Sequence, residues 1–174
     1  MELFLPVKPT VLVVDDSPVN LTLVVNLLHG HYSVKAAKSG EMALKIIDEE
    51  VPDLILLDIV MPMMNGYEVC RRIKANSSTQ HIPVIFLTSQ TEVENEALGL
   101  ELGAVDYITR PIKPSILMSR VRAQLATVSN SRSMRVSNEY LEFEVSKRTR
   151  QLAALQDVTI LALASLAETR DTDT

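Results

Sequence analysis

Acidic side chains stand directly after two apolar runs of the sequence, and their positions suit chemistry better than packing. Asp58 ends the run that begins at Leu54, and Asp15 and Asp16 follow the run that begins at Thr10. A short run that is apolar on both faces is typical of a central strand in a parallel sheet. Ligands of open α/β sheets bind where such strands end, so Asp58 is the first candidate. An aspartate that only caps a helix or forms a turn is the alternative.

Two further strand ends add a hydroxyl and a cation. The apolar run that begins at Pro83 leads to Thr88, and a short run that begins at Asp106 leads to Arg110. The carboxyl ends of parallel strands open on one edge of the sheet, so these side chains should meet the acids there. The residues expected at this edge are Asp15, Asp16, Asp58, Thr88 and Arg110.

Three carboxylates without histidine or thiol partners form a hard, oxygen-only site, which suits Mg²⁺ rather than zinc or copper. Without a cation, repulsion among the acids would raise the pKa of at least one of them. The metal and Arg110 could neutralise phosphoryl oxygens while Thr88 donates a hydrogen bond. The sequence has no Ser/His/Asp set, no P-loop and no GxGxxG motif. We therefore expect phosphoryl transfer to Asp58, and neither acyl transfer nor nucleotide hydrolysis.

The elements that must position these residues alternate regularly along the chain. Strands are expected at 10–14, 33–37, 54–58, 83–87 and 106–109, with helices after each, including 66–75, about 92–102 and 113 to about 128. Ser17 and Ser39 are expected helix caps. Five strands alternating with five helices in about 120 residues predict a doubly wound α/β fold with a parallel sheet.

Composition narrows the class of protein. The chain has 174 residues, of which 47% are hydrophobic and 4% aromatic, a net charge of −5 and a single cysteine, Cys70. The acidic balance argues against nucleic acid or an anionic membrane as the main partner. The first nine residues do not resemble a signal peptide, and no apolar run approaches the roughly 18 residues of a membrane span. We expect a cytoplasmic protein in which Cys70 is a buried hydrophobe.

Four motifs together resemble the receiver domain of two-component response regulators. They are VLVVDD (11–16), LILLDIVMPMMNG (54–66), VIFLTS (84–89) and GAVDYITRPI (103–112), which agree with that family in order and spacing. The resemblance implies a flavodoxin-like five-stranded sheet in the order 2-1-3-4-5. It also implies that Asp58 accepts a phosphoryl group from a sensor histidine kinase.

The same resemblance assigns the remaining roles. It implies that Asp16, Asp58 and the backbone carbonyl of Val60 hold Mg²⁺ directly, and that Asp15 acts largely through water. It implies that Thr88 is the switch hydroxyl and Tyr107 the switch aromatic. The peptide bond before Pro111 is usually cis in the family.

One position departs from the family pattern, because receivers carry a lysine where this chain has Arg110. Arginine keeps the charge but is longer, planar and forked, so the exchange is not neutral. We expect phosphorylation to survive and the switch or the lifetime of the phosphoryl group to change.

The chain beyond residue 128 has no Gly or Pro and predicts one long helix or two in series. A seam at alternating spacings of three and four residues is apolar at seven of ten positions, which is typical of an imperfect coiled coil. We expect parallel pairing into a homodimer, with an amphipathic helix lying on its own receiver as the alternative. The seam positions are Met134, Asn138, Leu141, Val145, Arg148, Leu152, Leu155, Thr159, Ala162 and Leu166.

Residues 140–171 resemble the linker and opening helix of HD-GYP response regulators, whose output domain hydrolyses cyclic di-GMP. On this basis residues 1–128 are a receiver domain, and residues 129–174 are a helical linker that leads toward an output domain absent from this chain. The metal ligands of that domain would follow Thr174, so we expect no phosphodiesterase activity from these residues.

Two other classes of protein stay open. A haloacid-dehalogenase-type phosphatase would need a DxD loop after its first strand, whereas this chain has Asp15-Asp16-Ser17 and no cap domain. A receiver-like scaffold that works without phosphate and dimerises through its tail is the other alternative.

Overall fold

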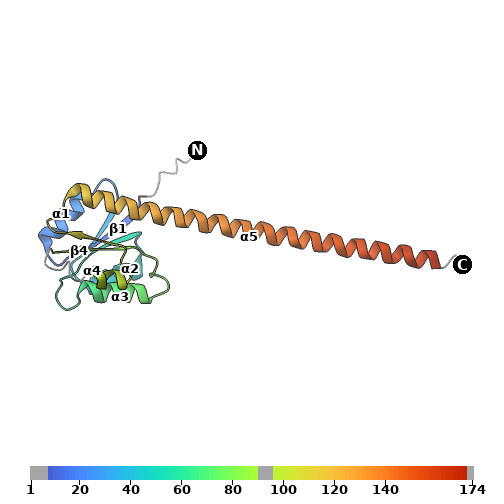
Figure 1. The fold of residues 1–174 in the computed structure, drawn as a ribbon, viewed down its shortest axis with the longest axis horizontal. Coiled ribbons are helices and arrows are strands. Elements are labelled where there is room, and N and C mark those ends of the chain that lie inside the picture. Colours follow the sequence, from blue (N-terminus) through green and yellow to red (C-terminus); the bar gives the residue numbers. More distant parts are fainter. Residues whose placement is uncertain (1–7, 90–95, 172–174) are drawn as a thin grey trace. The chain divides into compact units, whose positions relative to one another are not determined.

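A computed structural model describes residues 8–89 and 96–171, which include a five-stranded parallel sheet (Figure 1). The strand order is β2-β1-β3-β4-β5, and every neighbouring pair is parallel, so the predicted doubly wound topology is confirmed. The strands are β1 (Thr10–Val14), β2 (Ser33–Ala37), β3 (Leu54–Asp58), β4 (Val84–Thr88) and β5 (Asp106–Thr109).

The helices begin where the sequence provides capping side chains. Ser17, Ser39 and Asn65 accept hydrogen bonds from main-chain N–H groups in the first turns of α1, α2 and α3. The predicted fourth helix is described from Glu96, and its expected first residues at 92–95 lie outside the described ranges. The helices are α1 (Pro18–Leu28), α2 (Gly40–Glu49), α3 (Gly66–Ala75), α4 (Glu96–Glu101) and α5 (Pro114–Asp171).

Both faces of the sheet are covered, which explains the unbroken apolar runs in its central strands. Leu12, Val14 and their neighbours pack with side chains of α2 and α3 on one face. Val11 and Val13 pack with side chains of α1 and with the first turns of α5 on the other. Figure 1 shows these two helical layers on opposite sides of the strands. Because strand side chains alternate between faces, each strand is held from both sides and its end is well positioned.

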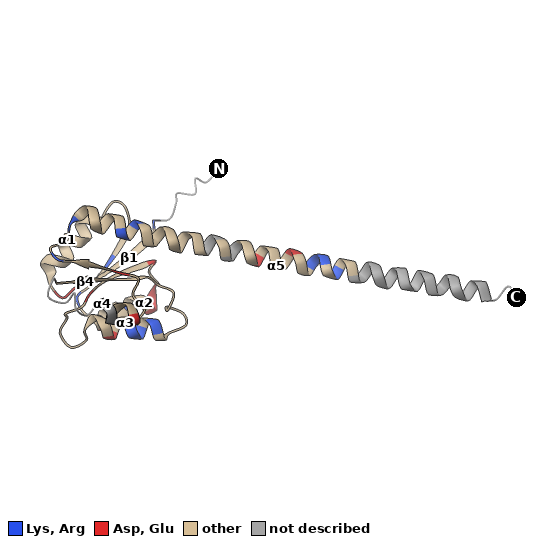
Figure 2. Cartoon of the chain, in the orientation of Figure 1, with Lys and Arg blue, Asp and Glu red and all other residues tan. Residues whose placement is uncertain are grey.

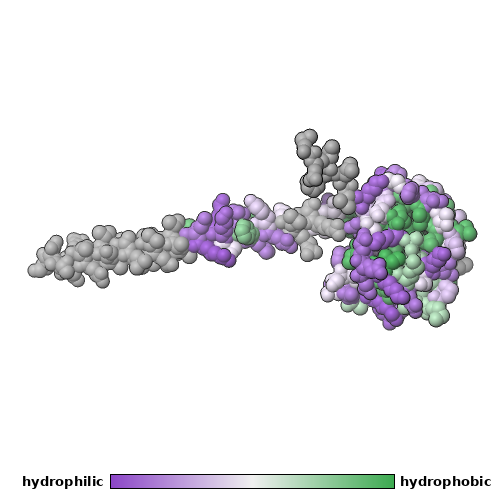
Figure 3. Space-filling model, turned by 180° about the vertical axis from the view of Figure 1, so that it is seen from behind, coloured by the Kyte–Doolittle hydropathy of each residue, from purple (hydrophilic) through white to green (hydrophobic). Residues whose placement is uncertain are grey.

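The C-terminal part of the chain is one continuous helix rather than two in series. The structure divides into two compact units, Met1–Val128 and Ser129–Thr174, and α5 begins in the first and makes up the described part of the second. Large apolar side chains of the second unit are exposed, including Met134, Leu141, Val145 and Leu152 at 56–71%. Along its described stretch a group of acidic residues is followed by a group of basic ones (Figure 2), and isolated hydrophobic side chains stand among hydrophilic ones (Figure 3).

None of the helices in the described ranges combines the length and hydropathy that a transmembrane span requires.

Candidate functional site

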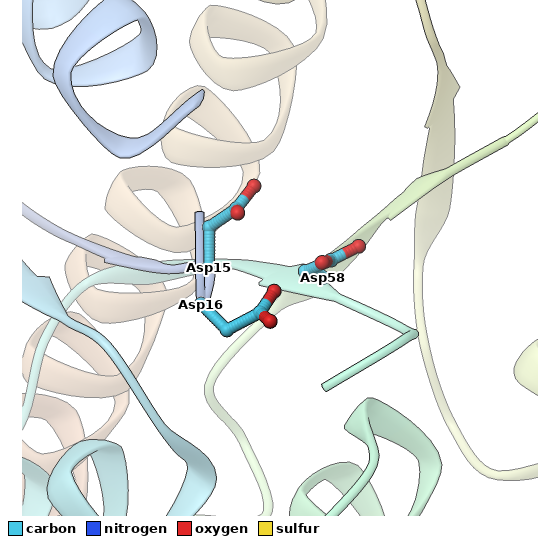
Figure 4. A group of neighbouring side chains, drawn as sticks. All are labelled: Asp15, Asp16 and Asp58. Carbon is cyan, nitrogen blue, oxygen red and sulfur yellow. The ribbon is translucent and has the colours of Figure 1, made fainter. Parts of the chain in front are cut away.

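The three predicted acids lie together at the carboxyl edge of the sheet. Each of Asp15, Asp16 and Asp58 offers a carboxylate oxygen, and these oxygens lie within 4.8 Å of one another. Asp15 and Asp16 directly follow β1, and Asp58 ends the neighbouring strand β3 (Figure 4). Asp15 and Asp58 are buried and Asp16 is exposed, so the cluster opens to solvent through Asp16.

Asp15 is held by hydrogen bonds from the turn that follows it. Its Oδ1 accepts from the Ser17 N–H at 2.9 Å and from the Asn20 side-chain amide at 3.4 Å. Its Oδ2 pairs with the guanidinium of Arg110. Both oxygens of this fully buried carboxylate are therefore satisfied, as a buried charge requires.

Asp58 has the environment of a group that resists ionisation. The pKa of Asp58 is raised from its ordinary 3.8 to about 6: burial raises it most, the Arg110 charge lowers it, and the charges of Asp15 and Asp16 raise it. A main-chain hydrogen bond from Ile59 also lowers this pKa. The net effect shows that Arg110 alone does not offset burial and the two neighbouring acids, so the site favours further positive charge.

Arg110 follows the outermost strand, β5, and its side chain reaches both buried acids. Its Nη2 lies 3.2 Å from Oδ1 of Asp58 and also pairs with Oδ2 of Asp15. The peptide bond between Arg110 and Pro111 is cis, as the family resemblance implied. The longer arginine side chain thus still brings its charge to Asp58.

Thr88 ends β4 and is buried beside the acid-bearing strands. Its hydroxyl donates a hydrogen bond to the Ser89 carbonyl at 3.1 Å. Tyr107 of β5 is half-buried, and the guanidinium of Arg120 lies 5.7 Å from its ring centroid. Arg120 in turn pairs with Asp106, so a strand residue and a helix residue together hold the position of Tyr107.

Val60 lies in the loop after β3, with its side chain 62% exposed. The predicted role of Val60 concerns its main-chain carbonyl, and it stays a prediction.

Two residues that support the site were missed by the sequence reasoning. Asn20 donates to Asp15 from the first turn of α1, and its spacing of five residues from Asp15 was the available signal. Gly66 begins α3 against the main chain of β3, where a β-carbon would collide with the Asp58 carbonyl oxygen. Sequence reasoning placed Gly66 only as a helix start, since no pattern reveals such a close approach.

The donor set fits a hard divalent cation. It consists of carboxylate oxygens, one of them on an exposed side chain. The raised pKa of Asp58 indicates that a cation beside its carboxylate would stabilise the ionised form. In the described part of the chain no other group of three or more possible metal-ligating side chains comes together. Cys70 is buried, with its thiol near the Leu102 carbonyl and with burial raising its pKa, so it behaves as the buried hydrophobe that was expected.

A family model described as "Response regulator receiver domain" matches residues 11–122, a range that contains every strand and all three acids. An acid triad of this kind is typical of the Mg²⁺ site in receivers.

The chain is also similar to curated proteins and to a solved structure. It is 50% identical over 165 residues to a "Probable cyclic di-GMP phosphodiesterase" of Vibrio cholerae, covering 95% of this chain and 37% of that protein. It is 37% identical over 147 residues to the DNA-binding response regulator MtrA of Mycolicibacterium smegmatis, covering 83% of this chain and 63% of that protein. The chain therefore spans less than two thirds of either relative.

The solved structure is the signal receiver domain of a signal transduction histidine kinase from Syntrophus aciditrophicus. It is 35% identical, has a TM-score of 0.64 and covers 69% of this chain and 92% of its own.

Proposed function

The chain belongs to the response regulator receiver domain family, and on that premise we propose that it accepts a phosphoryl group on Asp58 in a Mg²⁺-dependent reaction. One observation carries the proposal: three carboxylate oxygens of Asp15, Asp16 and Asp58 lie within 4.8 Å of one another at the carboxyl edge of the sheet. Arg110 contacts the same cluster. This arrangement brings an acceptor carboxylate and a fixed cation to one point.

Each residue of the site has a role in this proposal. Asp16, Asp58 and the Val60 carbonyl would hold Mg²⁺ directly, and Asp15 would act through water, since its own oxygens already accept protein hydrogen bonds. When bound, the ion supplies positive charge that offsets the negative charge of the phosphoryl oxygens.

The transfer itself is a displacement at phosphorus. An oxygen of Asp58 forms the new P–O bond while the P–N bond to the imidazole of a kinase phosphohistidine breaks. The imidazole nitrogen keeps the electron pair of that bond. Arg110 neutralises charge on the phosphoryl oxygens, and Thr88 turns its hydroxyl from the Ser89 carbonyl to donate to one of them. A sensor histidine kinase is therefore the proposed partner.

Mass spectrometry of the intact chain tests the acceptor role. After incubation with Mg²⁺ and a small phosphodonor such as acetyl phosphate, we expect a species heavier by about 80 Da, which is one HPO₃ group. The species should disappear in Asp58→Asn and when Mg²⁺ is chelated. Absence of the adduct in the unaltered chain would contradict the proposal and support the phosphate-independent scaffold. Turnover of a small phosphomonoester would support the phosphatase class instead.

The helical tail has a proposed role in relay. The match to the Vibrio relative covers 95% of the chain and therefore extends beyond the receiver into α5. On this basis residues 1–128 are a receiver domain and residues 129–174 a linker that passes the signal to a cyclic di-GMP phosphodiesterase of the HD-GYP type. The proposed linker pairs with a second copy through its seam, which would bury apolar side chains such as Leu141, Val145 and Leu152.

A further inference from the structure

One nitrogen of Arg110 joins two carboxylates of the acid cluster. Its Nη2 pairs with Oδ2 of Asp15 and lies 3.2 Å from Oδ1 of Asp58. The side chains of Asp15 and Asp58 are 0% and 5% exposed, so this guanidinium supplies positive charge where water has little access. The contact makes Arg110 a cation that already sits at the site proposed for Mg²⁺.

Asp15 has no oxygen left for a second cation without losing a partner. Its Oδ1 accepts two hydrogen bonds, and its Oδ2 is taken by Arg110. Asp58 is engaged by the same guanidinium nitrogen. A divalent ion that approaches these two acids therefore meets a charge of its own sign, already in contact with them.

Holding Arg110 against the acids costs free energy, which would be recovered if its side chain moved away. Its Nε is buried, and among the described residues it has no hydrogen-bond partner. A buried donor on a charged group is expensive to leave unpaired, so the bridge to the acids must outweigh that penalty. If a second cation weakens the bridge, nothing else at Nε retains the side chain.

Space for the displaced side chain lies next to it. Arg110 lines a hollow of about 160 Å³ together with Tyr107, Pro111, Lys113 and Arg120. The lining includes Lys113 and Arg120 and contains no acid, so a displaced guanidinium would meet water there and form no new ion pair. Arg110 can therefore leave the acids without crossing the packed core.

We propose that Arg110 is the resident counter-ion of the acid cluster and competes with Mg²⁺ for it, so that the arginine raises the Mg²⁺ concentration at which the site fills. This inference rests on the proposed function, because it concerns the same metal site. It goes further because the side chain at position 110 would set the Mg²⁺ affinity of the site.

Mg²⁺ titration of matched variants tests the competition. Isothermal calorimetry, with amide chemical shifts of Asp16 and Ile59 as a second readout, compares the unaltered chain with Arg110→Gln and Lys113→Gln. Arg110→Gln should bind Mg²⁺ about tenfold or more tightly, since a like charge in contact with the ligands is removed. Lys113→Gln removes an equal charge from an exposed residue of the same hollow and should change the affinity less than about threefold.

If Arg110→Gln is too unstable for calorimetry, its melting temperature with and without Mg²⁺ tests the competition instead. Without Mg²⁺ this variant should melt lower than the unaltered chain, because two buried acids have lost their cation. With saturating Mg²⁺ its melting temperature should rise by more than that of the unaltered chain. Equal Mg²⁺ affinities and equal Mg²⁺-induced shifts would overturn the inference, as would equal tightening by Lys113→Gln.

The same measurements separate the competition by Arg110 from the acceptor role of Asp58. If the unaltered chain binds Mg²⁺ and forms the adduct on Asp58 while Arg110→Gln binds no more tightly, only the competition is refuted. If neither protein binds Mg²⁺, the metal-dependent acceptor role fails as well.

Discussion

The main chain of Gly66 lies against the carbonyl oxygen of Asp58, with no room between them for a side chain. A β-carbon at position 66 would also lie 2.9 Å from Cα of Ile59. Gly66 donates its N–H to the Ile59 carbonyl at 2.8 Å, so the start of α3 is bound directly to the residue that follows β3. The position of Asp58 therefore depends on the absence of a side chain at residue 66.

Replacing Gly66 with alanine should destabilise the fold by about 1–3 kcal/mol, because the obstructing atoms are backbone and cannot turn aside. Urea unfolding of Gly66→Ala measures the loss. Gly40→Ala is the matched control, since Gly40 also begins a helix but a β-carbon there would meet side chains of Val69 and Met64. A loss at position 66 no greater than at position 40 would contradict the backbone explanation.

The raised pKa of Asp58 predicts that replacing this residue with asparagine increases the free energy of unfolding, by an amount that depends on pH. The folded protein binds the Asp58 proton more tightly than the unfolded chain, with a pKa of about 6 against an ordinary 3.8. This stabilising contribution is present below pH 3.8 and is lost as the pH rises through about 6. Without Mg²⁺, Asp58→Asn should therefore be more stable than the unaltered chain by on the order of 2 kcal/mol at neutral pH.

Denaturant unfolding of both proteins from pH 4 to 8 checks this prediction. The difference in unfolding free energy between Asp58→Asn and the unaltered chain should shrink toward zero near pH 4, where the Asp58 carboxyl is protonated and therefore also uncharged. A difference that stays constant across this range would show that the raised pKa is not its source.

Thr88 is expected to act through its hydroxyl rather than through packing. Thr88→Val keeps the shape of this buried side chain and removes the donor, so phosphorylation by a small phosphodonor should slow by about ten- to a hundredfold. Thr88→Ser keeps the donor and should stay within a fewfold of the unaltered rate. The adduct on Asp58, followed by mass over time, gives both rates, and equal rates for the two variants would remove Thr88 from the reaction.

The tail seam makes a prediction about association. Val145 lies on the seam and Ser146 beside it, and both are exposed in the single chain. Val145→Lys should weaken dimerisation by about tenfold or more because it places charge in the helix–helix contact, whereas Ser146→Lys should have little effect. Light scattering over a concentration series measures both. If neither change alters the molar mass, or if the unaltered chain is monomeric throughout, pairing through this seam is wrong.

Much of the fold could be predicted because its signals are local. An apolar run such as that of β3 predicts a strand that is covered on both faces. Ser17 and Ser39 predict helix starts because their side chains accept hydrogen bonds from the first turn of the helix. Helix limits were harder, since the sequence left open whether the tail was one helix or two, and α5 runs unbroken to Asp171. Nothing in the tail's composition distinguishes a continuous helix from a short interruption.

The sequence by itself determined which residues share the functional edge, because parallel strands end on the same side and Asp15, Asp58 and Thr88 each stand at such an end. Only the tertiary structure decided how those residues engage one another. The Arg110 bridge, the Asn20 hydrogen bond to Asp15 and the close approach of Gly66 depend on side-chain directions and on separations of a few ångströms. Sequence spacing places residues on elements, but contacts at that scale follow from how the elements pack.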